Sequence, residues 1–83
     1  MEYVLVVYRS RNVSVRAYNY LVKNGQICAL VSTPRQTGVG CGLSVKTNMA
    51  AVRTFYSELS SAETFVGFFV AKITARGQTI TRI

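Results

Sequence analysis

One cysteine in the chain stands where its thiol could do chemistry. Cys41 lies in the loop-forming segment 33–42, TPRQTGVGCG, with a glycine on either side. Because Gly40 and Gly42 have no side chains, they would leave the sulfur accessible and let backbone N–H groups turn toward one point. Arg35 in the loop, and Lys46 beyond it, add positive charge close in sequence. Together these features would lower the thiol pKa below about 8.5 and favour a thiolate that can accept and pass on a soft atom.

The same loop has two other interpretations. Gly-Cys-Gly can be a tight turn that happens to contain a small residue. The series Gly38-x-Gly40-x-Gly42 also suggests a phosphate-binding loop. It lacks the Lys-Ser/Thr ending of that motif, and an alternating strand pattern follows it in place of a helix. The reactive thiol is therefore the more specific hypothesis.

The rest of the chain offers few partners for catalysis. It has no histidine, so neither a serine nor a cysteine nucleophile has an imidazole base. Glu2, Glu58 and Glu63 are the only acids, which argues against a paired-carboxylate site. Two cysteines without histidine make a poor zinc site, and Cys28, inside an apolar run, is expected to be inert core. We predict a protein that is not an enzyme and holds no metal or cofactor.

The charge favours an anionic partner. Ten Lys and Arg against three acids give a net charge of +7, which attracts nucleic acid, acidic proteins or phosphorylated small molecules. A solvated basic surface is the simpler alternative. Aromatic residues on strands could stack RNA bases, although the Lys/Arg-Gly-Phe pattern of RNA-recognition sheets is missing. Those aromatic residues are Tyr3, Tyr8, Phe65, Phe68 and Phe69.

The number of cysteines, the first residues and the length of the apolar runs predict the cellular compartment. Two cysteines do not make the disulfide framework of a small secreted protein. The opening Met1-Glu2-Tyr3 carries an acid where a signal peptide has basic residues. The longest apolar stretch, 65–71, is far shorter than the about 20 residues of a membrane-spanning helix. We expect a cytoplasmic protein with reduced thiols and no membrane association.

Hydrophobic periodicity predicts the elements that must position the loop. Apolar runs predict strands near 3–8, 27–32, 43–46 and 65–73, the last with a bulge at Gly67. Helical spacing predicts helices near 12–24 and 48–59, with Asn12 as the first N-cap and Thr47 or Asn48 as the second. The order β-α-β-β-α-β predicts a ferredoxin-like α+β fold. Its antiparallel sheet has four strands, and both helices pack on one face.

The chain is long enough for one domain. We place that domain at residues 1–73 and leave 74–83 as a tail or a short extra strand. The first strand is apolar on both faces, whereas the second face of such a sheet is usually open. That surplus of apolar surface predicts at least a dimer, in which open faces stack or edge strands pair.

Several of these residues together resemble a known family. An apolar first strand ending in Tyr8, a helix, Gly25, Thr33-Pro34-Arg35 and then Cys41-Gly42-Leu43-Ser44-Val45 are similar to the Se/S carrier protein-like family of small bacterial and archaeal proteins. The resemblance covers about residues 3–70 and implies a compact α+β domain with Cys41 as the carrier residue. Gly40 departs from the small polar residue expected there, and residues 74–83 extend past the usual end. The Cys-Pro motif of the better-known sulfur-relay proteins is absent.

The combined hypothesis is a sulfur or selenium carrier that holds a persulfide or selenosulfide on Cys41. Gly40 and Gly42 would give access to the thiol, and Arg35 would stabilise the thiolate. Donor and acceptor proteins would be the partners, with a homo-oligomer expected. The alternative is a basic oligomeric module that binds an anionic ligand or RNA, in which Cys41 is incidental.

Overall fold

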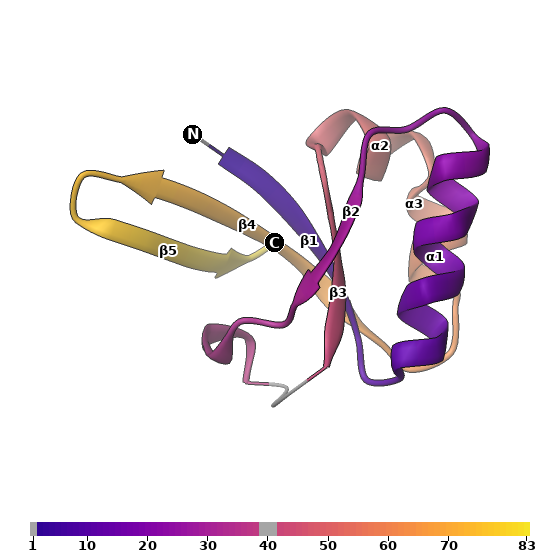
Figure 1. The fold of residues 1–83 in the computed structure, drawn as a ribbon, viewed down its shortest axis with the longest axis horizontal. Helices are drawn as coiled ribbons and strands as arrows, with labels where there is room; N and C mark the ends of the chain where they lie inside the picture. Colours follow the sequence, from indigo (N-terminus) through magenta and orange to yellow (C-terminus); the bar gives the residue numbers. More distant parts are fainter. Residues whose placement is uncertain (1, 39–41) are drawn as a thin grey trace.

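In a computed structural model, the protein is an antiparallel five-stranded sheet with its helices on one face (Figure 1). The structure describes residues 2–38 and 42–83. The strand order is β2-β3-β1-β4-β5. The strands are β1 (Glu2–Tyr8), β2 (Ala29–Ser32), β3 (Leu43–Thr47), β4 (Phe65–Thr74) and β5 (Gly77–Arg82). The α-helices are α1 (Arg11–Lys23), α2 (Met49–Thr54) and α3 (Tyr56–Ser60). A short 3-10 helix, η1 (Arg35–Thr37), follows β2.

Helix α1 begins earlier than its sequence pattern predicts. Ser10, and not Asn12, is the N-cap: its side chain accepts a hydrogen bond from the Val13 N–H. Ser10 has an extended backbone (φ −96°, ψ 127°), as an N-cap residue requires, whereas Asn12 is already inside the helix. At the other end Gly25 has a φ of 76°, a left-handed conformation that glycine adopts without steric cost.

The second predicted helix is present but divided at Phe55. Asn48 caps it as expected, since its side-chain oxygen accepts a hydrogen bond from the Ala51 N–H at 2.8 Å. Phe55 leaves helical geometry at φ −113° and ψ 25° and separates α2 from α3. Its N–H still donates to Ala51, and its carbonyl still accepts from Leu59. The division is therefore a kink within one helical segment.

The prediction of a four-stranded sheet is wrong, because residues 77–82 add a fifth strand, the second of the two alternatives predicted for residues 74–83. β5 pairs with β4 from the Thr74–Gly77 pair to the Phe69–Arg82 pair, forming a hairpin that projects from the body of the protein (Figure 1). Gly77, with a φ of 122°, begins β5 in a conformation that few other residues adopt. Near the start of β4 the pairing with β1 shifts register at Val66, one position from the bulge predicted at Gly67.

The main core lies between the sheet and the helices. Val4, Val6 and Tyr8 of β1 point toward the helices and pack with Leu21 of α1 and Leu59 of α3, all with at most 2% of their surface exposed. The Tyr8 hydroxyl donates to the Leu59 carbonyl at 2.7 Å, and burial raises the Tyr8 pKa above its usual range. This arrangement ties β1 directly to α3.

The opposite face of the sheet, which we call the helix-free face, has a smaller core of its own. Leu5 and Val7 alternate with the residues above and are completely buried, although no helix covers them. Phe69 lies beside them, and the partly buried residues packed against this cluster include Val31 of β2 and Ile80 of β5. The dimer prediction assumed that this face was open. Because one chain already buries it, that reason for a dimer no longer holds.

Candidate functional site

The cysteine loop joins β2 to β3, and hydrogen bonds fix its base. The Thr33 N–H donates to the Gly42 carbonyl at 3.0 Å, which extends the antiparallel pairing one step beyond Ser32 and Leu43. The hydroxyls of Thr33 and Ser44 are 2.7 Å apart and both residues are buried. The loop therefore starts and ends at two positions that this pairing holds together.

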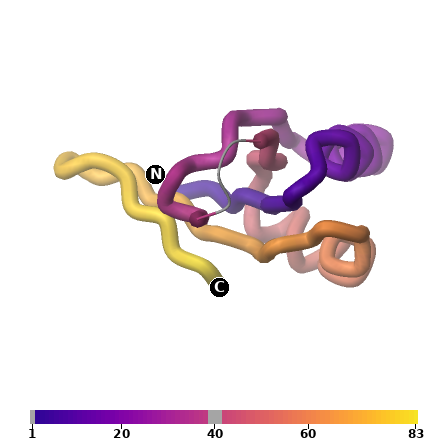
Figure 2. The backbone as a smooth tube through the Cα atoms, turned by 90° about the horizontal axis from the view of Figure 1, so that it is seen from below, coloured from indigo at the N-terminus to yellow at the C-terminus, as the bar shows by residue number. Residues whose placement is uncertain are grey.

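The first half of the loop is a compact turn. Pro34 precedes η1, and its carbonyl accepts hydrogen bonds from both the N–H and the hydroxyl of Thr37. Gly38 then ends η1 with a φ of 74°, and its N–H donates to the Arg35 carbonyl. The turn lies beside β5, on the side of the sheet away from the helices (Figure 2). Each of these bonds is local, so the sequence of the loop determines this turn.

Cys41, the predicted carrier residue, lies outside the described residues, as does Gly40. Of the other predicted site residues, Arg35 is exposed on η1 and Gly42 is half-buried at the base of the loop. A Cβ atom added at Gly42 would lie 3.7 Å from the Thr33 hydroxyl, an ordinary contact distance. Space alone therefore does not demand glycine at position 42.

Lys46 is close to the loop in sequence and was expected beside it, but in the structure it lies farther along β3. It pairs with Leu5 and Ala29, four residues along β3 from Gly42, which is about 13 Å of extended strand. Its ammonium group lies over the ring of Tyr3, 4.5 Å from the centroid. This is a cation–π contact on the helix-free face. Lys46 therefore belongs to the sheet surface and not to the environment of the loop.

Cys28 is at the other end of β2 from the loop. It precedes the strand, which begins at Ala29, and is half-buried against the helix-side core. Its Sγ lies 3.8 Å from the carbonyl of Tyr18 on α1, and burial raises its pKa. A raised pKa leaves less thiolate at neutral pH, so this cysteine is the less reactive type.

The sheet does not present the aromatic platform that base stacking needs. Tyr8, Phe65 and Phe68 face the helices, where their rings pack edge to face or tilted against one another. On the helix-free face Phe69 is only 5% exposed, and Tyr3 is half-buried with the Lys46 ammonium over its ring. The aromatic residues of the strands are therefore core residues, and the base-stacking interpretation loses its support.

Within residues 2–38 and 42–83, no three His, Cys, Asp or Glu side chains gather as metal ligands would. None of the described helices has the length and apolar character needed to span a membrane. The described part of the chain has a cavity of about 410 Å³ between α1 and α3, with the Arg16–Glu63 ion pair on its wall. A second cavity of about 330 Å³ lies beside Lys46, Tyr3 and Glu2.

Sequence reasoning missed the residues that hold the loop base. Thr33 and Ser44 are polar, and neither was identified as a site residue. A small hydroxyl on each side of a glycine-rich loop, at positions that an antiparallel pairing would bring together, is the signal that could have identified them. Ser14 adds a third contact, since its hydroxyl donates to the Leu43 carbonyl at 2.7 Å. It thereby ties the start of β3 to α1.

Comparison with protein families gives this geometry a context. Residues 2–66, well over half of the chain, match the family described as "Putative Se/S carrier protein-like". The match includes β1, α1 and the whole loop from Thr33 to Gly42, and it ends at the start of β4. None of the curated proteins and none of the solved structures matches the chain. The chain belongs to the Se/S carrier protein-like family.

Proposed function

We propose that the protein is a sulfur or selenium carrier and that Cys41 holds the transferred atom as a persulfide or selenosulfide. Family membership over residues 2–66, which include the cysteine loop, carries this proposal. The hydrogen-bonded base supports it, because a carrier must present its thiol from a defined position. Gly40 and Gly42 would leave the thiol accessible, and Arg35 would stabilise the thiolate.

The transfer would be two thiol exchange steps. The Cys41 thiolate attacks the terminal sulfur of a persulfide on the donor protein, forming a new S–S bond as the donor's own S–S bond breaks. The donor cysteine leaves as a thiolate. In the second step a nucleophile of the acceptor attacks the terminal sulfur, and the Cys41 thiolate leaves. Neither step needs a cofactor or a net redox change, and selenium would follow the same path.

Intact mass spectrometry tests the loading step directly. After incubation with a cysteine desulfurase and cysteine, the native protein should gain the mass of one sulfur atom, which dithiothreitol should remove. Cys28→Ser should still load, because its thiol is half-buried with a raised pKa, whereas Cys41→Ser should not. Loading of the Cys41→Ser protein would overturn the proposal.

The pH dependence of alkylation tests how the loop activates the thiol. In a Cys28→Ser protein, the alkylation rate of Cys41 should have its midpoint below about 8.5. Arg35→Ala should raise that midpoint by a few tenths of a pH unit to about one unit, since an exposed cation acts through solvent. A midpoint at or above that of free cysteine in both proteins would favour the basic binding module, with Cys41 incidental.

The finer features of the domain belong to the same proposal. We propose that β1–β4 with the helical segments form a ferredoxin-like βαββαβ unit, to which β5 is added at the β4 edge. The strand order β2-β3-β1-β4 supports this.

A homo-oligomer and a cytoplasmic location remain predictions, and light scattering at micromolar concentration would test the oligomeric state. The monomer mass would refute it.

A further inference from the structure

The helix-free face carries three positively charged side chains, and two of the three carboxylates of the chain lie away from it. Lys46 and Arg82 point to this face by the alternation of β3 and β5, and Arg35 lies on η1 beside β5 (Figure 2). Glu2 lies on the helix side of β1, with its carboxylate 3.9 Å from the ammonium of Lys72, and it also lines the cavity beside Lys46 and Tyr3. Glu58 and Glu63 line the cavity between the helices. These are all the carboxylate side chains of the chain, and among them only Glu2, which is paired with Lys72, shares a cavity with a cation of the helix-free face.

Two of these cations are already held in place. The ammonium of Lys46 lies over the Tyr3 ring, whose hydroxyl is hydrogen-bonded to Gln78 of β5. The Arg82 guanidinium lies across Gly67, and one of its N–H groups donates to the Val66 carbonyl at 2.8 Å. A guanidinium has five N–H donors, so most remain for a ligand. Side chains that are positioned in advance lose less conformational entropy when a partner binds.

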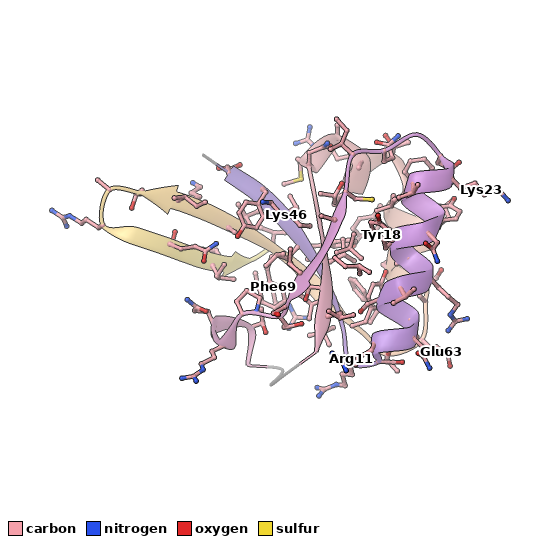
Figure 3. All side chains as sticks on the ribbon, viewed as in Figure 1. Arg11, Tyr18, Lys23, Lys46, Glu63 and Phe69 are labelled. Atoms are coloured by element: carbon pink, nitrogen blue, oxygen red, sulfur yellow. The ribbon has the colours of Figure 1, made fainter. Side chains whose placement is uncertain are left out.

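The surface between the cations fits a protein better than a nucleic acid. Ile80 and the ring of Tyr3 lie there, half-buried over Leu5 and Phe69. Lys46 and Phe69 lie on the side of the sheet away from α1 (Figure 3). An apolar centre with charged residues at the rim is the usual composition of a protein interface. Single-stranded nucleic acid instead needs exposed aromatic rings, and the described part of this face has none that is free.

We propose that the helix-free face is the docking surface for an acidic protein partner, with Lys46 and Arg82 as its principal charged contacts. The proposal rests on the carrier function, because η1 begins the cysteine loop and lies beside β5. A partner seated on β5 would therefore lie next to that loop. Attraction between opposite charges would speed its approach and orient it, as exchange with successive partners requires.

Charge reversal tests whether binding depends on the cations of the helix-free face or only on the overall positive charge of the protein. Binding of a fluorescein-labelled peptide of Glu-Gly-Leu repeats would be followed by anisotropy for the double variant Lys46→Glu/Arg82→Glu. The matched control is Lys23→Glu/Arg53→Glu on the helix side, which reverses one lysine and one arginine that are also exposed or partly exposed. Circular dichroism would establish that both variants fold. Lys46→Gln/Arg82→Gln provides a milder change that adds no repulsion.

The first double variant should weaken peptide binding about five- to tenfold and the control less than about twofold, with the glutamine variant in between. Equal weakening by both charge-reversed variants would overturn the proposal, as would tighter binding of an oligouridylate RNA than of the peptide. Cys41→Ser should bind the peptide like the native protein. Failure of sulfur loading and failure of docking are therefore separate results.

Discussion

The two faces of the sheet bury the same strand by different means. On the helix side, Val4, Val6 and Tyr8 of β1 are covered by three helices that follow β1 and β3 directly in sequence. On the helix-free face, Leu5 and Val7 are covered by side chains of Tyr3, Val31, Val66, Phe69 and Ile80. A small domain can thus hide both faces of its central strand without a partner, provided that side chains of the neighbouring strands and of an additional strand cover the second face.

The comparison also bears on the family. The family match ends at residue 66, so most of β4 and all of β5 lie beyond it. Phe69 and Ile80, both part of the second cluster, come from this region. The helix-free face of this protein therefore depends on residues outside the matched region, whereas most of the helix-side core lies within it.

The largest expected effect is the loss of stability when a buried leucine is truncated, compared between the two faces. Leu5 and Leu21 are both completely buried, the first on the helix-free face and the second against the helices. Leu5→Ala and Leu21→Ala should each lower the free energy of unfolding by about 2–5 kcal/mol, because each leaves a cavity. Urea denaturation measures both. A cost below about 1 kcal/mol for Leu5→Ala would mean that the side chains around Leu5, among them Phe69 and Ile80, do not pack over it in solution.

The next effect compares the buried hydroxyls of the two faces. Thr33→Val leaves the Ser44 hydroxyl without its partner, and Tyr8→Phe does the same to the Leu59 carbonyl. Each should cost about 1–3 kcal/mol in unfolding free energy. The double variant Thr33→Val/Ser44→Ala should cost less than the sum of its single variants, by about 0.5–1.5 kcal/mol. Strict additivity would contradict the direct contact between these hydroxyls.

A smaller effect tests the contribution of β5. Ile80 is half-buried in the second cluster, whereas Ile27 is 84% exposed. Ile80→Ala should lower the unfolding free energy by about 1 kcal/mol, and Ile27→Ala by less than about 0.5 kcal/mol. Thermal unfolding of the two variants under identical conditions measures the difference. Equal values would show that β5 adds no packing to this face.

The smallest effect concerns Cys28, on the helix side. Burial raises its pKa, so in a Cys41→Ser protein its alkylation midpoint should lie above about 8.5. The folded state then holds the thiol proton more tightly than the unfolded state. This contribution to stability is fully present below the unfolded pKa of about 8.5 and is lost as the pH rises through the higher folded pKa. Stability should therefore fall slightly across that interval, and Cys28→Ala should not show this fall.

Local sequence patterns predicted most of the elements and part of the site. The strands near 3–8, 43–46 and 65–73 and the cap at Asn48 are found close to their predicted positions, because periodicity and capping act over a few residues. The cap at Ser10 was missed because a serine and an asparagine two residues apart offer nearly equal N-caps. The turn around Arg35 follows from Pro34 and Gly38. Lys46 was wrongly expected near the loop. An extended strand places residues that are four apart in sequence about 13 Å from each other.

The sequence by itself determined the class of the domain, its basic charge, the absence of histidine and the one cysteine in a glycine-rich segment. Each of these depends on residue types and on short-range spacing. Only the tertiary structure decided that residues 77–82 join the sheet, that Leu5 and Val7 are buried without a helix, and that Thr33 meets Ser44. These three outcomes depend on which segments pair across the sheet, and that choice is made by the packing of the whole chain.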